Sequence, residues 1–314
     1  MEKIDSYAQI HEPDHTILVE LEELLGKKLH QGNMETVEVD FFGYIAENGR
    51  VVLLGLSNCE LQNIPKIIRY FDKLRILYAI NVNIKSIPEW LCDMNSLQRL
   101  ILTANRLTSI PNSIGKLTKL KVLNLSKNQL STLPCEIAHL VKLKKLRLSQ
   151  NQLSTLPDSI GGLKSLTHLD LRQNKFESLN ESLGALSNLK KLRLSHNQLQ
   201  SLPLSIKNLT NLEFLQCNNN IFCMIPPIFR HLTSLKVLNF KSNNLEDIPI
   251  WIHRWKNLQR LFLSKNKLKD LPDSILRLEK LVYLDISGMA YLGLYTNIEE
   301  MIRQLQTYGC KVIY

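Results

Sequence analysis

The chain has 314 residues, of which 44% are hydrophobic and 22% charged, a composition that is typical of a folded protein and excludes a disordered one. Its longest apolar runs are too short to span a bilayer. The net charge is +10, but residues 1–50 hold four Lys or Arg against eleven Asp or Glu, and the rest of the chain has a net charge of +17. This asymmetry indicates a structural boundary near residue 50.

The compartment is inferred from the cysteines and from the first residues. Met1 is followed by charged residues with no apolar stretch behind them, which is unlike a secretory signal. The six cysteines form no C-x-x-C pair and no regular disulfide framework. They therefore predict thiols in a reducing cytoplasm. The cysteines are Cys59, Cys92, Cys135, Cys217, Cys223 and Cys310.

Residues 1–50 are predicted to form an N-terminal cap. Asp14 is placed to cap an amphipathic helix with one apolar face. Residues 36–46 are predicted to form a strand, and the turn Glu47-Asn48-Gly49 leads directly into the next strand at residues 51–54. A hairpin should therefore close the first coil. The apolar face of the helix consists of Ile17, Leu18, Leu21, Leu24 and Leu25.

Residues 51–280 consist of ten units of 23 residues, without an insertion or deletion. Two of the clearest are LKKLRLSQNQLSTLPDSIGGLKS, from Leu143, and LKKLRLSHNQLQSLPLSIKNLTN, from Leu189. Position 1 of the unit is Leu after an opening Val51, and position 4 is always Leu. This fixed period predicts a solenoid in which each unit forms one coil. Positions 4 and 6 should point into the core, and positions 3, 5 and 7 outward.

Two further positions have structural roles. An Asn at position 9 can satisfy backbone groups of its own coil and of the neighbouring coil, so its loss should cost about 1–3 kcal/mol. Proline at position 15 occurs in nine of the ten units and should start the return segment; only Asn180 breaks the series. The predicted asparagine ladder is Asn105, Asn128, Asn151, Asn174, Asn197, Asn220, Asn243 and Asn266.

The unit L-x-x-L-x-L-x-x-N-x-L resembles the short leucine-rich repeats of intracellular Ras-group proteins and of stand-alone prokaryotic repeat proteins. The resemblance covers residues 51–287. It implies an α/β repeat fold, a right-handed solenoid or horseshoe with a parallel sheet on the concave face and short 3₁₀ or helical turns on the convex face. Such folds usually bind proteins, but the resemblance implies no particular partner.

Residues 281–314 are predicted to form a C-terminal cap of strand, helix and strand. Thr296 and Glu299 form a capping box for a helix that runs to Tyr308, and Gly309 ends it. Residues 310–314 then form a final apolar strand. With caps expected at both ends, we expect a complete stand-alone solenoid that is a monomer.

The sequence offers no catalytic constellation. It contains no phosphate-binding loop, no dinucleotide-binding glycine motif, no H-E-x-x-H and no G-x-S-x-G. The eight histidines fall at unrelated phases of the repeat and have no ligand-like spacing with the cysteines. We therefore expect a non-enzymatic protein with no cofactor, no metal and no catalytic residues.

The candidate site is the outward-pointing face of the predicted strands, where three zones follow one another. Exposed aromatic and Arg side chains on such a face are typical of binding hot spots. The early apolar zone is Ile76, Tyr78, Ile101 and Val122, with Arg99 among them. The basic zone is Lys145, Arg147, His168, Arg172, Lys191, Arg193 and His196 around Asp170. The late apolar zone is Phe214, Val237, Phe262 and Tyr283, with Arg260 among them.

These zones favour a scaffold that binds an acidic, partly apolar protein surface or peptide. The cluster of charges alone does not decide for a binding site, because duplication of the repeat and solvation of the surface explain it equally well. Polyanion or nucleic-acid binding is an alternative, which Asp170 disfavours because it interrupts the basic zone. A further alternative, an adaptor or regulator of a small GTPase or another signalling enzyme, rests on the resemblance alone. No membrane partner is expected.

Overall fold

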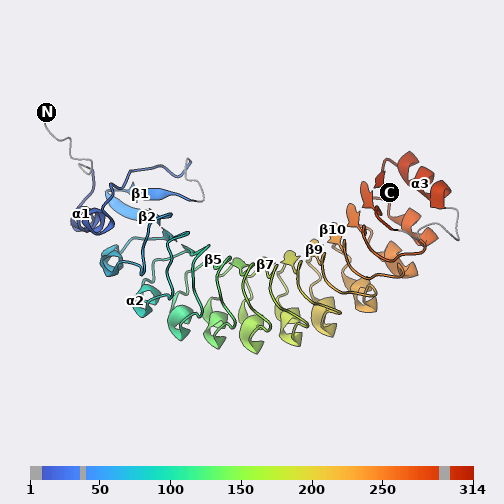
Figure 1. Cartoon of the computed structure of the whole chain (residues 1–314), viewed down its shortest axis with the longest axis horizontal. Helices are drawn as coiled ribbons and strands as arrows, with labels where there is room; N and C mark the ends of the chain where they lie inside the picture. Colours follow the sequence, from blue (N-terminus) through green and yellow to red (C-terminus); the bar gives the residue numbers. More distant parts are fainter. Residues whose placement is uncertain (1–8, 36–39, 290–297) are drawn as a thin grey trace. The chain divides into compact units, whose positions relative to one another are not determined.

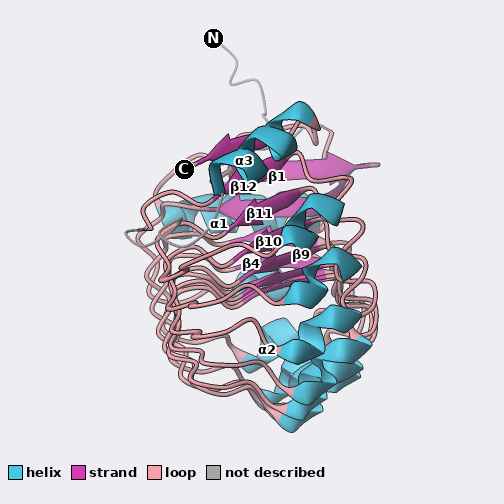
Figure 2. Ribbon diagram, turned by 90° about the vertical axis from the view of Figure 1, so that its right-hand side faces the viewer, coloured by secondary structure: helices cyan, strands magenta, loops and turns pink. Residues whose placement is uncertain are grey.

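The computed structural model describes residues 9–35, 40–289 and 298–314 and divides the chain into two compact units, Met1–Arg147 and Leu148–Tyr314. In each unit, short parallel strands lie on one side of the coils and short helical turns on the other (Figures 1 and 2). This is the predicted repeat architecture of parallel strands and 3₁₀ turns. We call the outward-pointing strand positions the strand face, and the side formed by the helical turns the return face.

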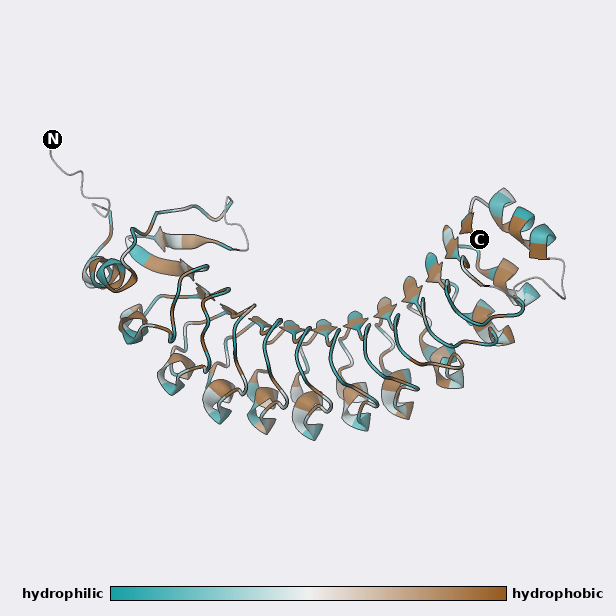
Figure 3. Cartoon of the chain, in the orientation of Figure 1, coloured by the Kyte–Doolittle hydropathy of each residue, from teal (hydrophilic) through white to brown (hydrophobic). Residues whose placement is uncertain are grey.

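The first unit begins with a helix and an antiparallel hairpin, followed by four parallel strands. β2, brown over most of its length in Figure 3, pairs with β1 on one edge and with β3 on the other. The helices are α1 (Asp14–Leu25) and α2 (Glu89–Cys92), and the 3₁₀ helices are η1 (Lys66–Tyr70), η2 (Asn112–Lys116) and η3 (Cys135–His139). The strands are β1 (Phe42–Glu47), β2 (Arg50–Leu56), β3 (Ile76–Tyr78), β4 (Arg99–Ile101), β5 (Val122–Asn124) and β6 (Lys145–Arg147).

The second unit repeats the same coil and ends in a helix and a strand that pairs parallel to β12. Its strands are β7 (His168–Asp170), β8 (Lys191–Arg193), β9 (Phe214–Gln216), β10 (Val237–Asn239), β11 (Arg260–Phe262), β12 (Tyr283–Asp285) and β13 (Lys311–Ile313). Its helical turns are η4 (Asp158–Gly162), η5 (Glu181–Ala185), η6 (Leu204–Asn208), η7 (Pro227–His231), η8 (Ile250–Arg254) and η9 (Asp273–Arg277), followed by α3 (Ile298–Thr307). The predicted capping residue Thr296 lies outside the described residues.

The return segments start where the prolines predict. In the third coil, Pro111 has a φ of −68° and its carbonyl oxygen accepts the first 3₁₀ bond, from the Ile114 amide at 3.0 Å. Proline is suited to this position because its φ is fixed. It has no N–H, but an N–H at the start of a helix would have no acceptor within the helix, so no hydrogen bond is lost. Asn180, which replaces proline in one coil, adopts a similar backbone conformation with a φ of −77°.

The position-9 asparagines join each coil to the one before it. The amide nitrogen of Asn128 donates to the carbonyl oxygens of Leu102 and Leu125, both at 3.0 Å, and its Oδ1 accepts the Leu107 N–H at 3.0 Å. Asn197, Asn220, Asn243 and Asn266 make the same three kinds of bond in the second unit. Side chains thus satisfy backbone groups that a turn between strand and return segment would leave buried and unpaired.

The turn after each strand has a backbone conformation that the sequence analysis missed. At position 8, φ is positive and lies between 54° and 59° at ten non-glycine residues, from Asn58 to Lys265. Left-handed backbone disfavours β-branched side chains most strongly. The sequence signal was available, because no Val, Ile or Thr occupies this position in any of these coils.

The prediction that Asp14 caps the first helix is wrong. Asp14 is the first residue of α1, and its carboxylate points away from the helix and accepts the Val51 N–H at 2.7 Å and the Arg50 guanidinium at 3.0 Å. The predicted apolar face is wrong at one position: Leu24 is 61% exposed, whereas Glu22 is buried and accepts the Leu29 N–H. Because α1 packs beside η1, only Ile17, Leu18 and Leu21 of the five predicted residues are fully in contact with the core.

Close packing of the return segments depends on small residues at position 19. An added Cβ at Gly184 would lie 2.3 Å from the Ser205 Cβ and 2.4 Å from the Ser205 carbonyl oxygen. We expect Gly184→Ala to destabilise the protein by about 1–3 kcal/mol, because the backbone of η6 would have to move. Urea unfolding measures the change. Ala185→Gly, one residue further on, is the matched control, and an equal loss in both variants would contradict the steric explanation.

Candidate functional site

The strand face is built by the alternation of side chains along each short strand. The position-4 leucines, such as Leu192 and Leu215, are completely buried, while their neighbours at positions 3 and 5 point away from the core. Parallel pairing brings equal positions of successive coils side by side, as with Lys191 and Phe214. Side chains at these positions therefore form columns across the strands of each unit.

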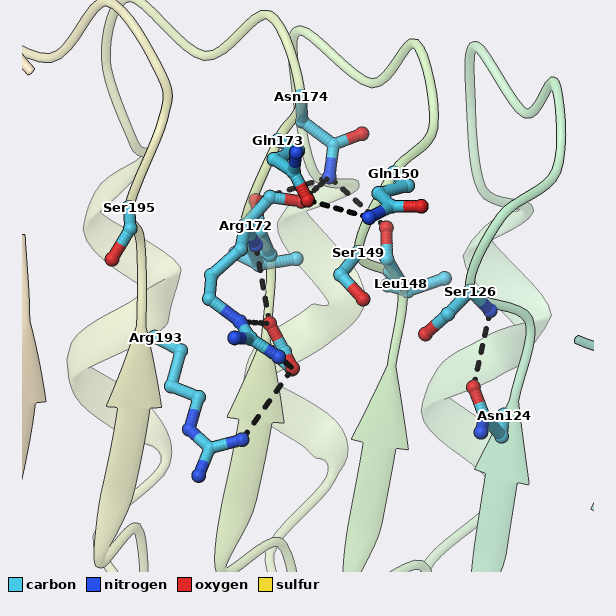
Figure 4. Close-up of polar contacts among 12 residues, drawn as sticks. Asn124, Ser126, Leu148, Ser149, Gln150, Arg172, Gln173, Asn174, Arg193 and Ser195 are labelled. Atoms are coloured by element: carbon cyan, nitrogen blue, oxygen red, sulfur yellow. Dashed lines mark hydrogen bonds and ion pairs between the residues drawn. The ribbon is translucent and has the colours of Figure 1, made fainter. Parts of the chain in front are cut away.

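In the second unit, one carboxylate organises two arginines. Arg172 binds Asp170 with two side-chain bonds, from Nε at 2.8 Å and from Nη2 at 2.7 Å, and its backbone N–H also donates to Asp170. Arg193 approaches the same carboxylate at 3.8 Å, and in Figure 4 the dashed lines from the two arginines meet there. The bond to Asp170 raises the pKa of Arg172. Asp170, counted in the sequence analysis as an interruption, is thus the residue that positions the arginines.

Arg193 also lies against an aromatic ring. Its guanidinium carbon is 5.5 Å from the centre of the Phe214 ring, within the range of a cation–π interaction. Lys191 pairs in register with Phe214 and is exposed. His168, its neighbour on the other side, is half-buried and lies 2.9 Å from the Thr167 hydroxyl. His196 is exposed at position 8, 3.2 Å from the Asn219 amide nitrogen.

The late apolar zone lies on β9 to β12 of the same unit. Phe262 and Tyr283 form a tilted ring pair with centroids 5.1 Å apart. Phe214 and Val237 pair in register, and all four side chains are half-buried. Arg260 is exposed and lies in register between Val237 and Tyr283. The second unit therefore presents one arginine over an aromatic ring, followed by an apolar column with a second, exposed arginine.

In the first unit, part of the predicted apolar zone is used internally. Ile76 and Tyr78 pack against the cluster formed by Ile45, Val52 and Leu53, because the β1–β2 hairpin and Phe41 lie beside them. Ile101 is only 6% exposed. The prediction that these three residues are an open binding patch is therefore wrong for Ile101, and Ile76 and Tyr78 serve at least in part to close the N-terminal cap.

The remaining candidates of the first unit are accessible. Arg99 and Arg147 are exposed, and Val122 and Lys145 are half-buried and pair in register. Lys145 and Arg147 form no ion pair with any residue that the structure describes, and the residue that pairs with Arg147 in the preceding strand is the neutral Asn124. The basic zone thus differs in kind between the units: paired and oriented in the second, and solvent-facing in the first.

Position 5 has a local function that the sequence analysis did not foresee. Asn124 and Asp170 accept the backbone N–H of position 7 in their own coils, and Asp285 does the same. A short Asn or Asp side chain is suited to this because its oxygen reaches the N–H two residues on. The signal in the sequence is the recurrence of Asn or Asp at position 5, which stabilises the turn as well as lining the strand face.

Asp285 predicts a pH dependence of stability. It is 7% exposed; burial raises its pKa, but bonds from the Ser264 hydroxyl and from Ser287 outweigh this and lower the pKa below its ordinary value of 3.8. Its contribution is therefore present above about pH 4 and lost as the pH falls through the lower, folded-state pKa. We expect Asp285→Asn to be less stable than the unaltered chain at pH 7, with the difference shrinking towards about pH 2 in thermal melts.

Four of the six cysteines are buried in the core. Burial raises the pKa of the Cys59, Cys92, Cys217 and Cys310 thiols, which makes them poor nucleophiles. Among residues 9–35, 40–289 and 298–314, no group of three or more His, Cys, Asp or Glu side chains could hold a metal ion. No helix in these ranges has the length and apolarity needed to cross a membrane.

Thiol labelling tests this assignment. All six cysteines are outside disulfides, but only Cys135 and Cys223 are exposed. A maleimide at neutral pH should therefore modify two thiols of the native chain rapidly and the other four only on unfolding, as counted by mass spectrometry. The double variant Cys135→Ser/Cys223→Ser should take up none. Rapid labelling of a third site in the native chain would contradict the burial of the other four.

Comparison with known proteins agrees with the repeat architecture. Residues 133–220 match the model of a leucine-rich repeat region, and residues 95–153 match that of a leucine-rich repeat. A leucine-rich-repeat protein of Leptospira interrogans superposes with a TM-score of 0.60 at 29% identity, covering 83% of this chain and 77% of that one. The repeated unit of this chain is therefore a leucine-rich repeat. A search of the curated proteins gave no match.

Two receptor structures are also similar. The leucine-rich-repeat ectodomain of the Arabidopsis thaliana receptor kinase GASSHO1/SCHENGEN3, solved in complex with CASPARIAN STRIP INTEGRITY FACTOR 2, superposes with a TM-score of 0.62 at 28% identity and covers 85% of this chain. A TDR receptor has a TM-score of 0.60 at 31% identity and covers 75% of it. This chain spans only 35% and 47% of those two receptor chains. Leucine-rich-repeat folds of this kind support protein interaction in general.

Proposed function

We propose that this protein is a non-catalytic scaffold whose strand face in the second unit binds an acidic, partly apolar protein surface or peptide. The observation that supports this most strongly is the arrangement of Arg193, which lies between the Asp170 carboxylate and the Phe214 ring. An arginine that is already oriented loses less side-chain entropy when it binds a carboxylate. Lys191 adds charge beside it, and Phe262 and Tyr283 add aromatic surface on the neighbouring strands.

The arrangement favours a protein over a polyanion. Arg172, the arginine nearest Asp170, already has both of its side-chain bonds directed to that carboxylate, which leaves fewer charges for phosphates. The half-buried apolar column from Phe214 to Tyr283 would gain little from a phosphate backbone but would be covered by an apolar partner. A steep fall of affinity with salt would instead indicate polyanion binding.

The test is affinity purification from the native cell with charge-reversed variants. Lys191→Glu/Arg193→Glu should lose the partner, because both charges that steer an acidic surface are reversed. The matched control Lys164→Glu/Lys175→Glu changes the net charge equally at exposed positions away from the strand face and should retain the partner. Lys145→Glu/Arg147→Glu tests the first unit separately. Retention by Lys191→Glu/Arg193→Glu would overturn the proposal.

We also propose that the protein acts as a monomer in the cytoplasm. Six cysteines outside disulfides support this location, because exposed thiols such as Cys135 and Cys223 persist in a reducing compartment. Sedimentation at low and high salt tests the monomer. A sedimentation coefficient that rises with protein concentration would contradict it.

A further inference from the structure

The return face of the second unit departs from the repeat at two positions in three consecutive coils. Position 16, directly after the proline position, is polar or charged in most other coils but is Leu204, Pro227 and Ile250 in the coils of η6, η7 and η8. Position 19 is Gly or Ala in four earlier coils but is Lys207, Arg230 and His253 in the same three. Since side chains three residues apart lie on one side of a 3₁₀ helix, each of these coils presents an apolar and a basic side chain together.

The apolar side chains are open to solvent. Leu204 is 68% exposed and Ile250 is 77% exposed. Met224 is 57% exposed at position 13, where the other nine units have a Ser, Thr, Asn or Asp. With Pro227 and Cys223, which are also exposed, they form what we call the return patch. A core role does not explain these residues, and the neighbouring coils show that the fold does not require them.

A groove lies within the return patch, along the return segments around η6 and η7. In the preceding coils a glycine lets adjacent return segments pack in direct contact, as at Gly161 and Gly184. At the same position the coils of η6 and η7 have Lys207 and Arg230, and the segments around these two helices line an open groove of about 800 Å³. Its lining includes the apolar residues Leu204, Met224 and Pro227 and the charged residues Arg230 and Glu181.

The charged residues at the groove indicate which charge a bound segment should carry. Arg230 lines the groove, is exposed and forms no ion pair with any residue that the structure describes. The Glu181 carboxylate, in contrast, already accepts the Leu204 and Ser205 amides at 3.0 and 2.8 Å. The Ser205 backbone bond lowers the pKa of Glu181, so this acid stays ionised and bound within the fold. Among the residues that line the groove, the charge left without a partner in the described structure is therefore positive.

We propose that the return patch is a second docking surface, which binds an amphipathic segment of a partner protein with apolar side chains on one face and carboxylates along one edge. The apolar face covers Leu204, Met224 and Ile250, and the acidic edge lies along Lys207 and Arg230, the two basic residues at position 19 of the η6 and η7 coils. An anionic membrane fits less well, because Glu246 and Asp247 border the patch in the coil of η8 and are exposed. These carboxylates orient a segment but would repel a lipid surface.

Peptide selection against the full-length chain tests the proposal. Short random peptides displayed on phage are selected on the unaltered chain after depletion on Leu204→Ser/Met224→Ser/Ile250→Ser. We expect peptides whose affinity falls at least about tenfold in the triple variant and which are rich in Asp and Glu beside apolar residues. Lys207→Glu/Arg230→Glu should weaken the same peptides. Val282→Ser, which removes an exposed apolar side chain elsewhere in this unit, should not.

Each other outcome overturns the proposal. If no peptide depends on the patch, the surface binds no such segment; if the dependent peptides are basic, the charge assignment is wrong. Patch-dependent flotation with phosphatidylserine vesicles, without acidic peptides, would assign the surface to a membrane. The side chains substituted in the return patch and in its Val282 control are exposed, so an unchanged melting temperature is expected for these variants, and Met224→Ser alone serves if the triple variant unfolds. Lys191→Glu/Arg193→Glu should keep these peptides, which separates this surface from the strand face.

Discussion

Replacing Asp14 with alanine should lower the free energy of unfolding of the N-terminal cap by about 3 kcal/mol. Asp14 is completely buried, and its two carboxylate oxygens accept the Val51 N–H at 2.7 Å and the Arg50 guanidinium at 3.0 Å. Alanine would leave a buried N–H without a partner and remove one of the two acids that balance Arg50. The bond to Val51 connects α1 to β2, so the loss should loosen the cap before the repeats.

Hydrogen exchange locates that effect and supplies its control. Exchange should quicken over α1 and β2 in Asp14→Ala, while the coils of the second unit keep their protection. Asp72 binds the same guanidinium, but its side chain is 54% exposed, so Asp72→Ala should cost no more than about 1 kcal/mol. If the two variants lose equal stability, the buried carboxylate does not hold the cap to the first coil.

Asp14 also marks the limit of what local sequence could predict. An acid at the start of an apolar helical pattern is a common capping signal, but its actual partners lie 36 and 37 residues further along the chain. No spacing rule connects those positions. The contacts between repeats were predictable because each coil packs against a coil of similar sequence. The position of a residue in the 23-residue unit therefore also identifies the residues that it contacts in the next coil.

In the candidate site, too, the contacts within the repeat were predictable and the contacts with residues outside it were not. The columns of the strand face follow from the repeat, and the parallel register places Lys191 beside Phe214 as position 3 predicts. Whether a side chain of the strand face is accessible to a partner depends on residues outside the repeat. The hairpin that packs against Ile76 and Tyr78, for example, belongs to the N-terminal cap. The pairing of Arg172 with Asp170 was also beyond the pattern, because position 7 is Ser or Thr in most coils and carries no charge there.

The largest effect in the second unit is expected from Asn220. Its Nδ2 donates to the carbonyl oxygens of Leu194 and Cys217, both at 3.0 Å, and its Oδ1 accepts the Leu199 N–H at 3.0 Å. Alanine would leave all three backbone groups buried without this partner, so we expect Asn220→Ala to cost about 3 kcal/mol or more in urea unfolding. The bonds from Asn220 to Leu194 and Leu199 cross between coils, so cooperativity between neighbouring repeats should fall as well.

A second substitution separates hydrogen bonding from packing at this position. Asn220→Leu fills the volume but, like alanine, offers no polar atom, so it should be at least as damaging as Asn220→Ala. Asn244→Ala, at half-buried position 10 of the next coil, is the matched control and should cost less than about 1 kcal/mol. Recovery of stability in Asn220→Leu would show that the ladder contributes volume alone. A loss in both variants would show that the backbone of each turn needs the amide, which explains why asparagine recurs at position 9 from Asn105 to Asn266.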